Sequence, residues 1–514
     1  MQNTLPHSTK PSTQPRLSRL LGSVWSFLWR SFRLVYAGCM RLWSGMFRLP
    51  FWSLWVCCFA LGVSIAGIGN DPLWYDESFT ARLARLDLPH MFTAIAGDVH
   101  PPLYYMIEWV TGHLFGYSEI ALRMPSLVFG VGGVAMLYHT VRSIAGDREG
   151  RLASLMWAMM PAGINYAQEA RGYSLLVLLV FGGLYAAHKG RWRLLAVIVA
   201  AMLLTHNLSV FYSGVIGVVA ASKSLGRTIR ACFGAGVLYA PWAIVAFQQM
   251  QAVRSGFWIA PQTFGAIPYA LVYTTLFSRW PPAAAFSVIM LVCGLSAVAL
   301  WSLRSDFRKL APLIALVAVP PAAMFAVSAI WKPIFLDRGL LPSGAGMVAT
   351  WAIALVRMRL PDRLTAAAIL APVMVSGLIG FYGNVSNDFD WTAPARIIRE
   401  NSQPCDAIYH ANVASYIQID GYYPGHSYLL PEANDLSQSL TDQTKDAAGI
   451  RRDTLEHVAA SHCRVWFVYV STPLISDAEY RFSQDTLSSY PTIQRWDLYS
   501  TPLATFKLYL LRVK

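Results

Sequence analysis

Two adjacent acids, Asp76 and Glu77, are the first candidates for chemistry in the chain, within the stretch LWYDESFTARL (residues 73–83). They follow directly after the first long apolar run, residues 51–69, and aromatic residues typical of a membrane–water interface surround them. A carboxylate at the end of a membrane helix can accept a proton from an attacking hydroxyl group. The alternative for Asp76 is a structural role as a helix N-cap. The alternative for Glu77 is a hydrogen bond or a salt bridge to a loop arginine.

Further ionisable and polar side chains gather beside later apolar runs. Ionisable residues at membrane depth are costly and are usually functional. Cations can bind a phosphate group and stabilise the charge that grows on it as it leaves. Together with a carboxylate, such cations predict the transfer of a group from a lipid phosphate to an acceptor. The candidates beyond Asp76 and Glu77 are Asp98, His100, Glu169, Arg171, Tyr173, His206, Lys332 and Arg338.

Several of these candidates have simpler explanations. His100 can bond to the loop backbone, and His206 can serve only to shape a tight turn. Arg171 and Tyr173 can anchor a helix at the lipid headgroups. The long side chain of Lys332 can carry its ammonium group to the interface without binding a substrate.

The composition indicates a helical membrane protein that crosses the bilayer many times. Of the 514 residues, 55% are hydrophobic and only 13% are charged, whereas soluble domains average about 25% charged residues. The net charge of +13 does not indicate a nucleic-acid partner, because the basic residues beside aromatic ones are explained by membrane interfaces. No required cofactor or metal is predicted, since the His, Asp and Glu residues lack metal-ligand spacing; incidental binding of a divalent cation stays open.

Apolar runs near 20 residues long predict about 11 transmembrane helices within residues 51–383. Basic residues cluster in every second loop, which places those loops in the cytoplasm. The loop at residues 70–119, which carries the two acids, then faces outward, and Phe264–Trp280 stays unplaced. The expected spans are residues 51–69, 121–141, 152–167, 173–188, 194–206, 208–222, 231–248, 282–302, 310–331, 339–356 and 364–382.

The segment 1–50 contains no acidic residue and is expected to lie on the cytoplasmic leaflet. Its six arginines between residues 16 and 48 fall within an arc of roughly 100° when projected on a helix. This pattern predicts an amphipathic interfacial helix, with a disordered basic leader as the alternative. Eleven spans counted from the cytoplasmic side place the two termini on opposite sides of the membrane. The prediction is therefore a multi-pass protein of the inner (cell) membrane with a cytoplasmic N-terminus and a periplasmic or extracellular C-terminus.

Residues 384–514 differ in kind and predict a small soluble α/β domain on the outer side. Two β-like runs, DAIYHA and RVWFVYV, flank the helical pattern LEHVAASHC. Cys405 and Cys463 each precede one of these runs. In an oxidising outer compartment they are expected to form a disulfide, with two free thiols as the alternative.

Three segments carry a family resemblance: DPLWYDESFT, DVHPPLYYMIEWVTGHLFGYSEIALRMPS and INYAQEARGYS. They resemble the membrane glycosyltransferases of the GT-C superfamily, in the bacterial branch related to protein mannosyltransferases and the lipid A aminoarabinose transferase. The resemblance covers most of residues 50–400. That family often has Arg-Tyr at the later outer loop, where this chain has Arg338 followed by Gly339.

The resemblance implies a sugar donor linked to a polyprenyl phosphate, usually undecaprenyl or dolichyl phosphate. It implies two surface helices in the first outer loop, and Asp76 as the base or the acceptor-positioning residue. The partners would be this donor, membrane lipids, and a lipid, glycan or protein acceptor. Two rival hypotheses are a transporter or flippase of a lipid-linked saccharide and a membrane anchor for the C-terminal domain. A transporter would place polar residues near the bilayer midplane and often contain an internal repeat; neither is seen in this sequence.

Overall fold

The computed structural model describes residues 51–255, 259, 261–276, 282–383, 390–431, 433, 440–471, 477–500 and 505–513. The predicted interfacial helix within residues 1–50 lies outside them. The chain divides between Trp55 and Val56, and the contacts reported below lie within Val56–Lys514.

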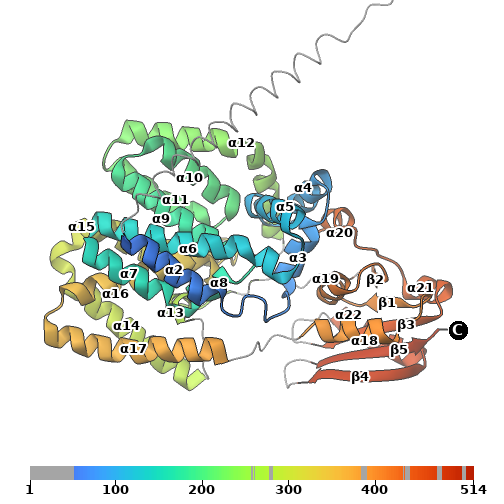
Figure 1. Cartoon of the computed structure of the whole chain (residues 1–514). Helices are drawn as coiled ribbons and strands as arrows, with labels where there is room; N and C mark the ends of the chain where they lie inside the picture. Colours follow the sequence, from blue (N-terminus) through green and yellow to red (C-terminus); the bar gives the residue numbers. More distant parts are fainter. Residues whose placement is uncertain are drawn as a thin grey trace, which may run out of the picture. The chain divides into compact units, whose positions relative to one another are not determined.

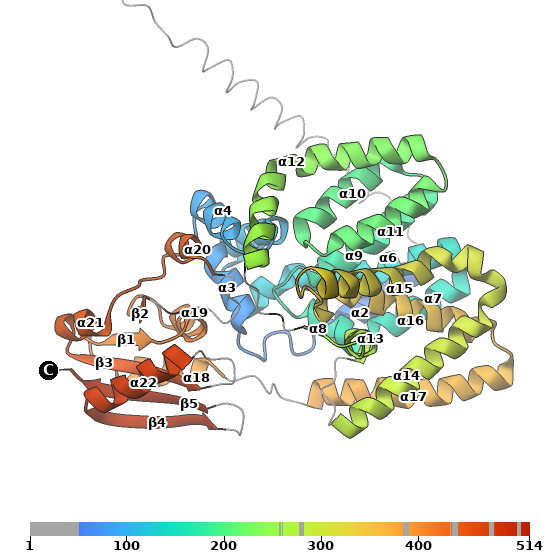
Figure 2. The same cartoon turned by 180° about the vertical axis from the view of Figure 1, so that it is seen from behind.

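Residues 51–383 form helices throughout most of their length (Figures 1 and 2). Each of the expected spans coincides with one or two of them. In chain order they are α2 (Phe51–Ile65), α3 (Tyr75–Ala84), α4 (Leu88–Ala96), α5 (Leu103–Phe115), α6 (Glu119–Ile144), α7 (Asp147–Ala158), α8 (Pro161–Ala167), α9 (Tyr173–Lys189), α10 (Trp192–Thr205), α11 (Ser209–Ala221), α12 (Leu225–Ser255), α13 (Ala266–Leu276), α14 (Pro282–Ser302), η1 (Arg304–Asp306), α15 (Phe307–Ile330), η2 (Asp337–Leu340), α16 (Leu341–Arg357) and α17 (Leu360–Gly383).

Five helical segments within the described residues are long and apolar enough to cross a membrane. They contain α6, α12, α15, α16 and α17, and shorter apolar helices such as α9, α10 and α11 accompany them. The chain is therefore a multi-pass membrane protein by the length and composition of its helices, while the number of 11 spans stays a prediction.

Three local features differ from the expected spans. The third span is divided into α7 and α8 because Pro161, which has no amide hydrogen to donate, begins α8. Arg227 and Arg230, expected in a cytoplasmic loop, lie within α12. Part of the unplaced segment Phe264–Trp280 forms α13.

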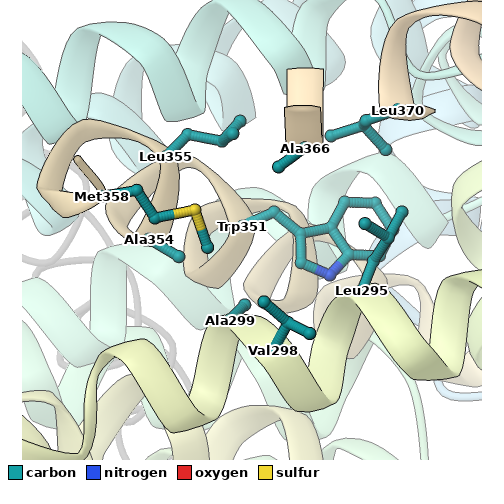
Figure 3. A pocket seen from close by; sticks show the side chains of 9 residues that line it. All are labelled: Leu295, Val298, Ala299, Trp351, Ala354, Leu355, Met358, Ala366 and Leu370. Atoms are coloured by element: carbon teal, nitrogen blue, oxygen red, sulfur yellow. The ribbon is translucent and has the colours of Figure 1, made fainter. Parts of the chain in front are cut away.

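The helix α16 lies at the centre of the membrane part. Its most apolar stretch is 94% buried, and it packs against α7, α13, α14 and α15. Gly344 permits the contact with α13, since a Cβ atom at this position would lie only 2.5 Å from the carbonyl oxygen of Thr274. A small apolar cavity of about 20 Å³ remains between α14, α16 and α17, beside Trp351 and Leu370 (Figure 3). It has room for about one water molecule and is not a substrate site.

The loop at residues 70–119 contains three helices, α3, α4 and α5, rather than the two that the family resemblance implied. Two of them pack against the C-terminal domain, α3 against α19 (Val413–Tyr422) and α4 against α20 (Asp442–Ala447). Phe79 and Leu83 of α3 share one apolar cluster with Tyr416 and Ile417 of α19. Burial of such side chains stabilises the contact by about 1.5–3 kcal/mol each, so the loop and the domain support one another.

The C-terminal domain contains a five-stranded sheet with the order β2-β1-β3-β5-β4. The strand β1 pairs in parallel with β2 and β3, whereas β5 pairs antiparallel with β3 and β4. The predicted runs DAIYHA and RVWFVYV correspond to β1 and β3. The remaining bounds are β1 (Ala407–His410), β2 (Ser427–Leu429), β3 (Arg464–Ser471), β4 (Thr492–Ser500), β5 (Thr505–Arg512), α18 (Thr392–Asn401), α21 (Leu455–Ser461) and α22 (Asp477–Ser489).

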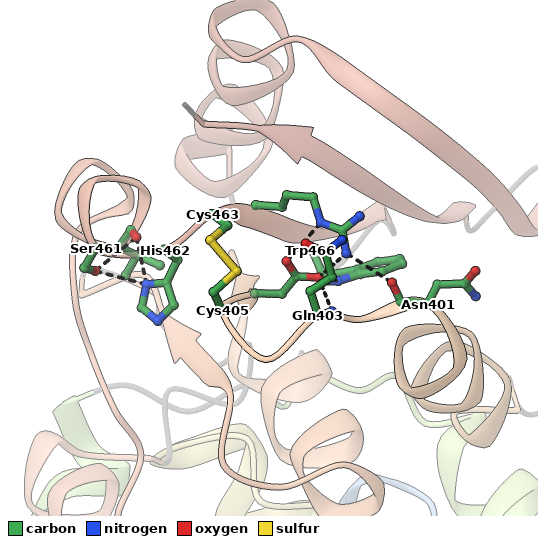
Figure 4. The surroundings of a disulfide bond; sticks show 10 residues. Asn401, Gln403, Cys405, Ser461, His462, Cys463 and Trp466 are labelled. Atoms are coloured by element: carbon green, nitrogen blue, oxygen red, sulfur yellow. Dashed lines mark hydrogen bonds and ion pairs between the residues drawn. A yellow bond between two sulfur atoms is a disulfide. The ribbon is translucent and has the colours of Figure 1, made fainter.

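Cys405 and Cys463 form a disulfide at the start of β1 and β3, with their Cα atoms 5.5 Å apart (Figure 4). A bridge that closes a loop of this length stabilises a domain by about 4 kcal/mol in the chain-entropy model. Beside it, Arg464 donates two hydrogen bonds to Asp406, at 2.7 and 3.0 Å, and Trp466 donates a third to the same carboxylate at 3.0 Å. These contacts join the two strands below the bridge.

Candidate active site

The helix α3 places Asp76 and Glu77 in its first turn, where acids interact favourably with the positive end of the helix dipole. Trp74, not Asp76, occupies the N-cap position. The geometry therefore does not favour a structural role of Asp76 as the N-cap of α3. The carboxylate of Glu77 accepts a hydrogen bond from the amide of Trp74 at 3.3 Å, so Glu77 is the acid that supports the helix start.

Glu77 is fully buried and faces Arg123 of α6. The guanidinium donates to the two carboxylate oxygens at 2.9 and 2.7 Å, and the amide of Ala170 donates at 2.7 Å. The remaining donors of Arg123 reach the backbone carbonyls of Ile68, Asp71 and Pro72. With its lone pairs occupied, Glu77 is positioned to join α3, α6 and the loop before α9. The geometry thus favours the ion-pair alternative over a direct role in chemistry.

Asp76 lies between two arginines from distant parts of the chain. Its Oδ2 atom accepts a hydrogen bond from Arg338 of η2 at 3.0 Å, and a guanidinium nitrogen of Arg171 lies 3.8 Å away. Burial tends to raise the pKa of the Asp76 carboxyl, but the positive charges of Arg338 and Arg171 outweigh it and lower that pKa. Asp76 is consequently ionised at neutral pH.

Arg171 is held in place by residues of the loop at 70–119. It donates to the hydroxyl groups of Thr80 and Tyr105 at 3.3 and 3.4 Å, and to the Nε2 atom of His100 at 2.9 Å. Because Nε2 accepts this bond, the ring proton of His100 lies on Nδ1, which donates to Asp98 at 2.7 Å. Asp98 and His100 thereby orient the guanidinium that faces Asp76.

Arg338 has donor capacity left after its contact with Asp76. Its guanidinium lies over the rings of Trp74 and Tyr173, 5.5 and 5.9 Å from their centroids, so stacking against aromatic faces fixes its plane. Its Nε atom is buried without a hydrogen-bond partner among the described residues. An anionic ligand with several acceptor oxygens would satisfy this donor.

Two further candidates, Glu169 and His206, lie in the same region. Burial raises the pKa of Glu169 to about 8, and the nearby Glu77 adds to the effect. The ring of His206 lies 5.7 Å from that of Tyr173.

The structure thus brings together residues from four junctions that are far apart in the sequence. Asp76 lies with Arg171, His206 and Arg338, and Tyr173 lies beneath the last of these. Lys332 has no hydrogen bond or ion pair with the described residues, so its role stays a prediction. Trp74, Thr80 and Tyr105 were not singled out from the sequence, because only the folded loop shows which aromatic and hydroxyl groups face the arginines.

The helical membrane part, the helical loop at residues 70–119 and the small C-terminal sheet together form a GT-C-like fold. Residues 99–248 match the family model described as dolichyl-phosphate-mannose-protein mannosyltransferase. The sequence resemblance stated above is thereby confirmed. The matched region contains the candidate site residues His100, Glu169, Arg171 and His206.

Among solved structures, the chain is similar to ArnT from Cupriavidus metallidurans. The structure of ArnT bound to undecaprenyl phosphate gives a TM-score of 0.59 at 13% identity, over 89% of this chain and 98% of ArnT. The apo state gives 0.60 at 14% identity, over 89% and 97%. At this identity the similarity establishes the fold.

Among curated proteins, the chain is similar to YkcB of Bacillus subtilis (strain 168), a protein named as a mannosyltransferase. The two are 28% identical over 80 residues. The matched segment is 16% of this chain and only 11% of YkcB.

Proposed function

We propose that this protein transfers a sugar from a polyprenyl-phosphate donor to an acceptor hydroxyl on the outer face of the membrane. The observation that carries the proposal is the single carboxylate of Asp76 held between Arg338 and Arg171. The mannosyltransferase match and the undecaprenyl phosphate bound by ArnT support the choice of donor. The acceptor is a lipid, a glycan or a protein.

In the proposed reaction the acceptor oxygen attacks the anomeric carbon of the sugar. The bond between that carbon and the phosphate oxygen breaks, the polyprenyl phosphate leaves with the electron pair, and the proton of the acceptor passes to Asp76. A single displacement of this kind inverts the anomeric configuration. Arg171 and Arg338, with Tyr173 beside them, stabilise the charge that develops on the phosphate, and Lys332 is proposed to contribute to the same task.

The low pKa of Asp76 makes it a weak base before the donor binds, because both guanidinium groups stabilise its charged form. A donor phosphate that binds the same arginines would draw their charge away from Asp76. Its carboxylate would then become more basic at the moment when the acceptor needs it. Donor binding and base activation are thus linked through the shared arginines.

The test uses purified protein, membrane extract and a panel of radiolabelled polyprenyl-phosphate sugars. Asp76→Asn should lower the single-turnover rate by about 10²–10⁴, as expected for the loss of a positioned base, with donor affinity kept or raised, because the arginines no longer share their charge with a carboxylate. Arg171→Ala should weaken donor binding and also slow the reaction. The matched control is Asp71→Asn, an exposed carboxylate of the same loop, which should react like the wild type.

Loss of donor binding in Asp76→Asn with unchanged binding in Arg171→Ala would reverse the assigned roles. The same assay tests the cofactor prediction. A chelator such as EDTA should leave the rate unchanged, since guanidinium groups supply the positive charge at the phosphate. Movement of labelled lipid-linked sugar across vesicles without any labelled product would instead favour the flippase hypothesis.

We also propose that the N-terminus is cytoplasmic and that the loop containing Asp76 and the C-terminal domain are periplasmic. This orientation rests on the basic residues in the proposed inner loops. It places the site on the face where lipid-linked donor and acceptor would meet.

A further inference from the structure

A groove of about 810 Å³ lies between α10 and α12, which run side by side (Figures 1 and 2). It is lined at the start of α10, by Trp192 and its neighbours. The opposite end of α10 leads to His206 in the candidate active site. Fourteen helical residues rise about 20 Å, so the groove and the site lie at opposite ends of this helix.

Four arginines line the groove: Arg191, Arg193, Arg227 and Arg230. All four are exposed, and none of them has an acidic partner among the residues that the structure describes. Two of them have other contacts: the guanidinium of Arg191 lies 5.5 Å from the centroid of the Tyr185 ring, and the Nε atom of Arg230 donates to the backbone carbonyl of Gly226 at 3.4 Å. The four guanidinium groups thus form a concentrated positive charge that no carboxylate of the described residues neutralises.

The floor of the groove is apolar and runs along both helices. Ala196 lies one turn after Trp192 on α10, while Ala231, Gly234 and Leu238 follow one another along a face of α12. A Cβ atom at Gly234 would lie 3.4 Å from that of Ala196, so the helices approach closely there. A soluble anion would need only the basic rim, whereas this floor suits a hydrocarbon chain.

The indole of Trp192 supplies a second and independent indication of a ligand. Its Nε1 atom is buried and has no hydrogen-bond partner among the described residues. A buried tryptophan N–H usually has an acceptor, because leaving the donor unpaired costs about 1–3 kcal/mol. The same residue lines the basic groove, where an anionic oxygen can accept a hydrogen bond from the indole N–H.

We infer that this groove binds an anionic glycerophospholipid, with the phosphate at the four arginines and the indole N–H and an acyl chain along the floor. Basic pockets between membrane helices on the cytoplasmic side suit such headgroups. The site lies at the end of α10 opposite Asp76 and goes beyond the proposed sugar transfer. It requires neither donor nor acceptor, so it can be tested without turnover.

The test is native mass spectrometry of the full chain in detergent, titrated with phosphatidylglycerol or phosphatidylcholine. Phosphatidylglycerol should bind more tightly. The single variants Arg227→Gln and Arg230→Gln should each weaken the binding of phosphatidylglycerol about fivefold, which is the effect of one basic residue beside an anionic headgroup. Trp192→Phe keeps an aromatic ring but removes the N–H, and should weaken binding about tenfold.

The matched control is the double variant Arg308→Gln and Lys309→Gln, two exposed cations at the start of α15. It should bind phosphatidylglycerol like the wild type. Equal binding of the two lipids, or an equal loss in this control, would overturn the inference. Displacement of phosphatidylglycerol by millimolar inorganic phosphate would make the groove a free-phosphate site. Stronger displacement by undecaprenyl phosphate would make it a site for the carrier lipid, and either result would reject a glycerophospholipid.

Discussion

Asp76 and Glu77 have the same functional group and adjacent positions, yet they have opposite environments. Successive residues of a helix point about 100° apart, which turns Glu77 toward Arg123 and Asp76 toward Arg338 and Arg171. The sequence predicted that acids and cations of several junctions meet at one face. It did not predict which acid would pair with which arginine, because that depends on how α3 is rotated against α6 and η2.

Glu108 of α5 is a second buried acid whose state can be tested. It is fully buried, and neither carboxyl oxygen has a hydrogen-bond partner among the described residues. The hydroxyl of its neighbour Tyr104 is 2.7 Å from that of Ser126. Burial raises the pKa of Glu108 to about 8, so in the folded protein the carboxyl is mostly neutral at pH 7.

We expect this carboxyl to make the protein less stable as the pH rises. An unfolded glutamate ionises near pH 4.3, while folded Glu108 keeps its proton up to about pH 8. Between these values the folded state binds more protons, so stability falls with increasing pH, by up to about 1.4 kcal/mol per pH unit. Glu108→Gln should reduce this fall, measured as thermal unfolding midpoints in detergent at pH 5 and pH 8.

Glu169, whose pKa is also raised to about 8, should maintain part of the fall in the Glu108→Gln protein. The exposed Glu400 provides the control, and Glu400→Gln should leave the pH dependence unchanged. An identical fall in wild type and Glu108→Gln would show that Glu108 ionises normally.

The helix α3 connects the candidate site to the C-terminal domain. Asp76 lies in its first turn, and Arg82 in its last turn donates to Asp420 of α19 at 2.7 Å. Arg82 also donates to the carbonyls of Ala448 and Gly449, at 2.8 and 3.0 Å. The position of Asp76 relative to the arginines thus depends on a contact made at the other end of its helix.

Arg82→Ala should lower the rate of sugar transfer by roughly 10²-fold, since a displacement of about 1 Å in a reacting group has an effect of that size. Donor affinity should change less, because Arg171 and Arg338 remain in place. The charge-swapped pair Arg82→Asp and Asp420→Arg should recover part of the rate. Single-turnover rates and donor affinities measure both effects.

The control for this element is Arg85→Gln. Arg85 is an exposed cation of the same loop whose guanidinium lies over the ring of Tyr117, and its loss should leave the rate within about twofold of wild type. If Arg82→Ala reacts like Arg85→Gln, the C-terminal domain does not position α3.

At the scale of elements, apolar periodicity located the helices well and their ends poorly. The positions of β1 and β3 followed from runs of β-branched and aromatic residues. The sequence did not predict that α12 begins before Arg227 and Arg230, because these charges suggested a loop at the place where the helix begins. The packing of α3 on α19 was also missed, since no local pattern encodes a contact between segments so far apart.

The whole molecule offers a test of its orientation in the membrane. A reporter that is active only in the cytoplasm, fused after Lys514, should stay silent if the C-terminal domain is periplasmic. The same reporter inserted after Arg304, between α14 and α15 in a proposed inner connection, should be active. The disulfide between Cys405 and Cys463 is consistent with an oxidising compartment. A strong signal from the fusion after Lys514 would contradict the orientation.

The contact between Arg82 and Asp420 has a consequence for biosynthesis. The two residues are 338 positions apart, and ribosomes add about 5–20 residues per second. Roughly 17–70 s therefore pass between the synthesis of α3 and that of α19. Throughout this interval Phe79 and Leu83 lack the apolar partners that α19 later provides. The packing of α3 therefore waits until α19 has been synthesised. A premature stop before residue 413 would leave a membrane part in which Phe79 and Leu83 never gain these apolar partners.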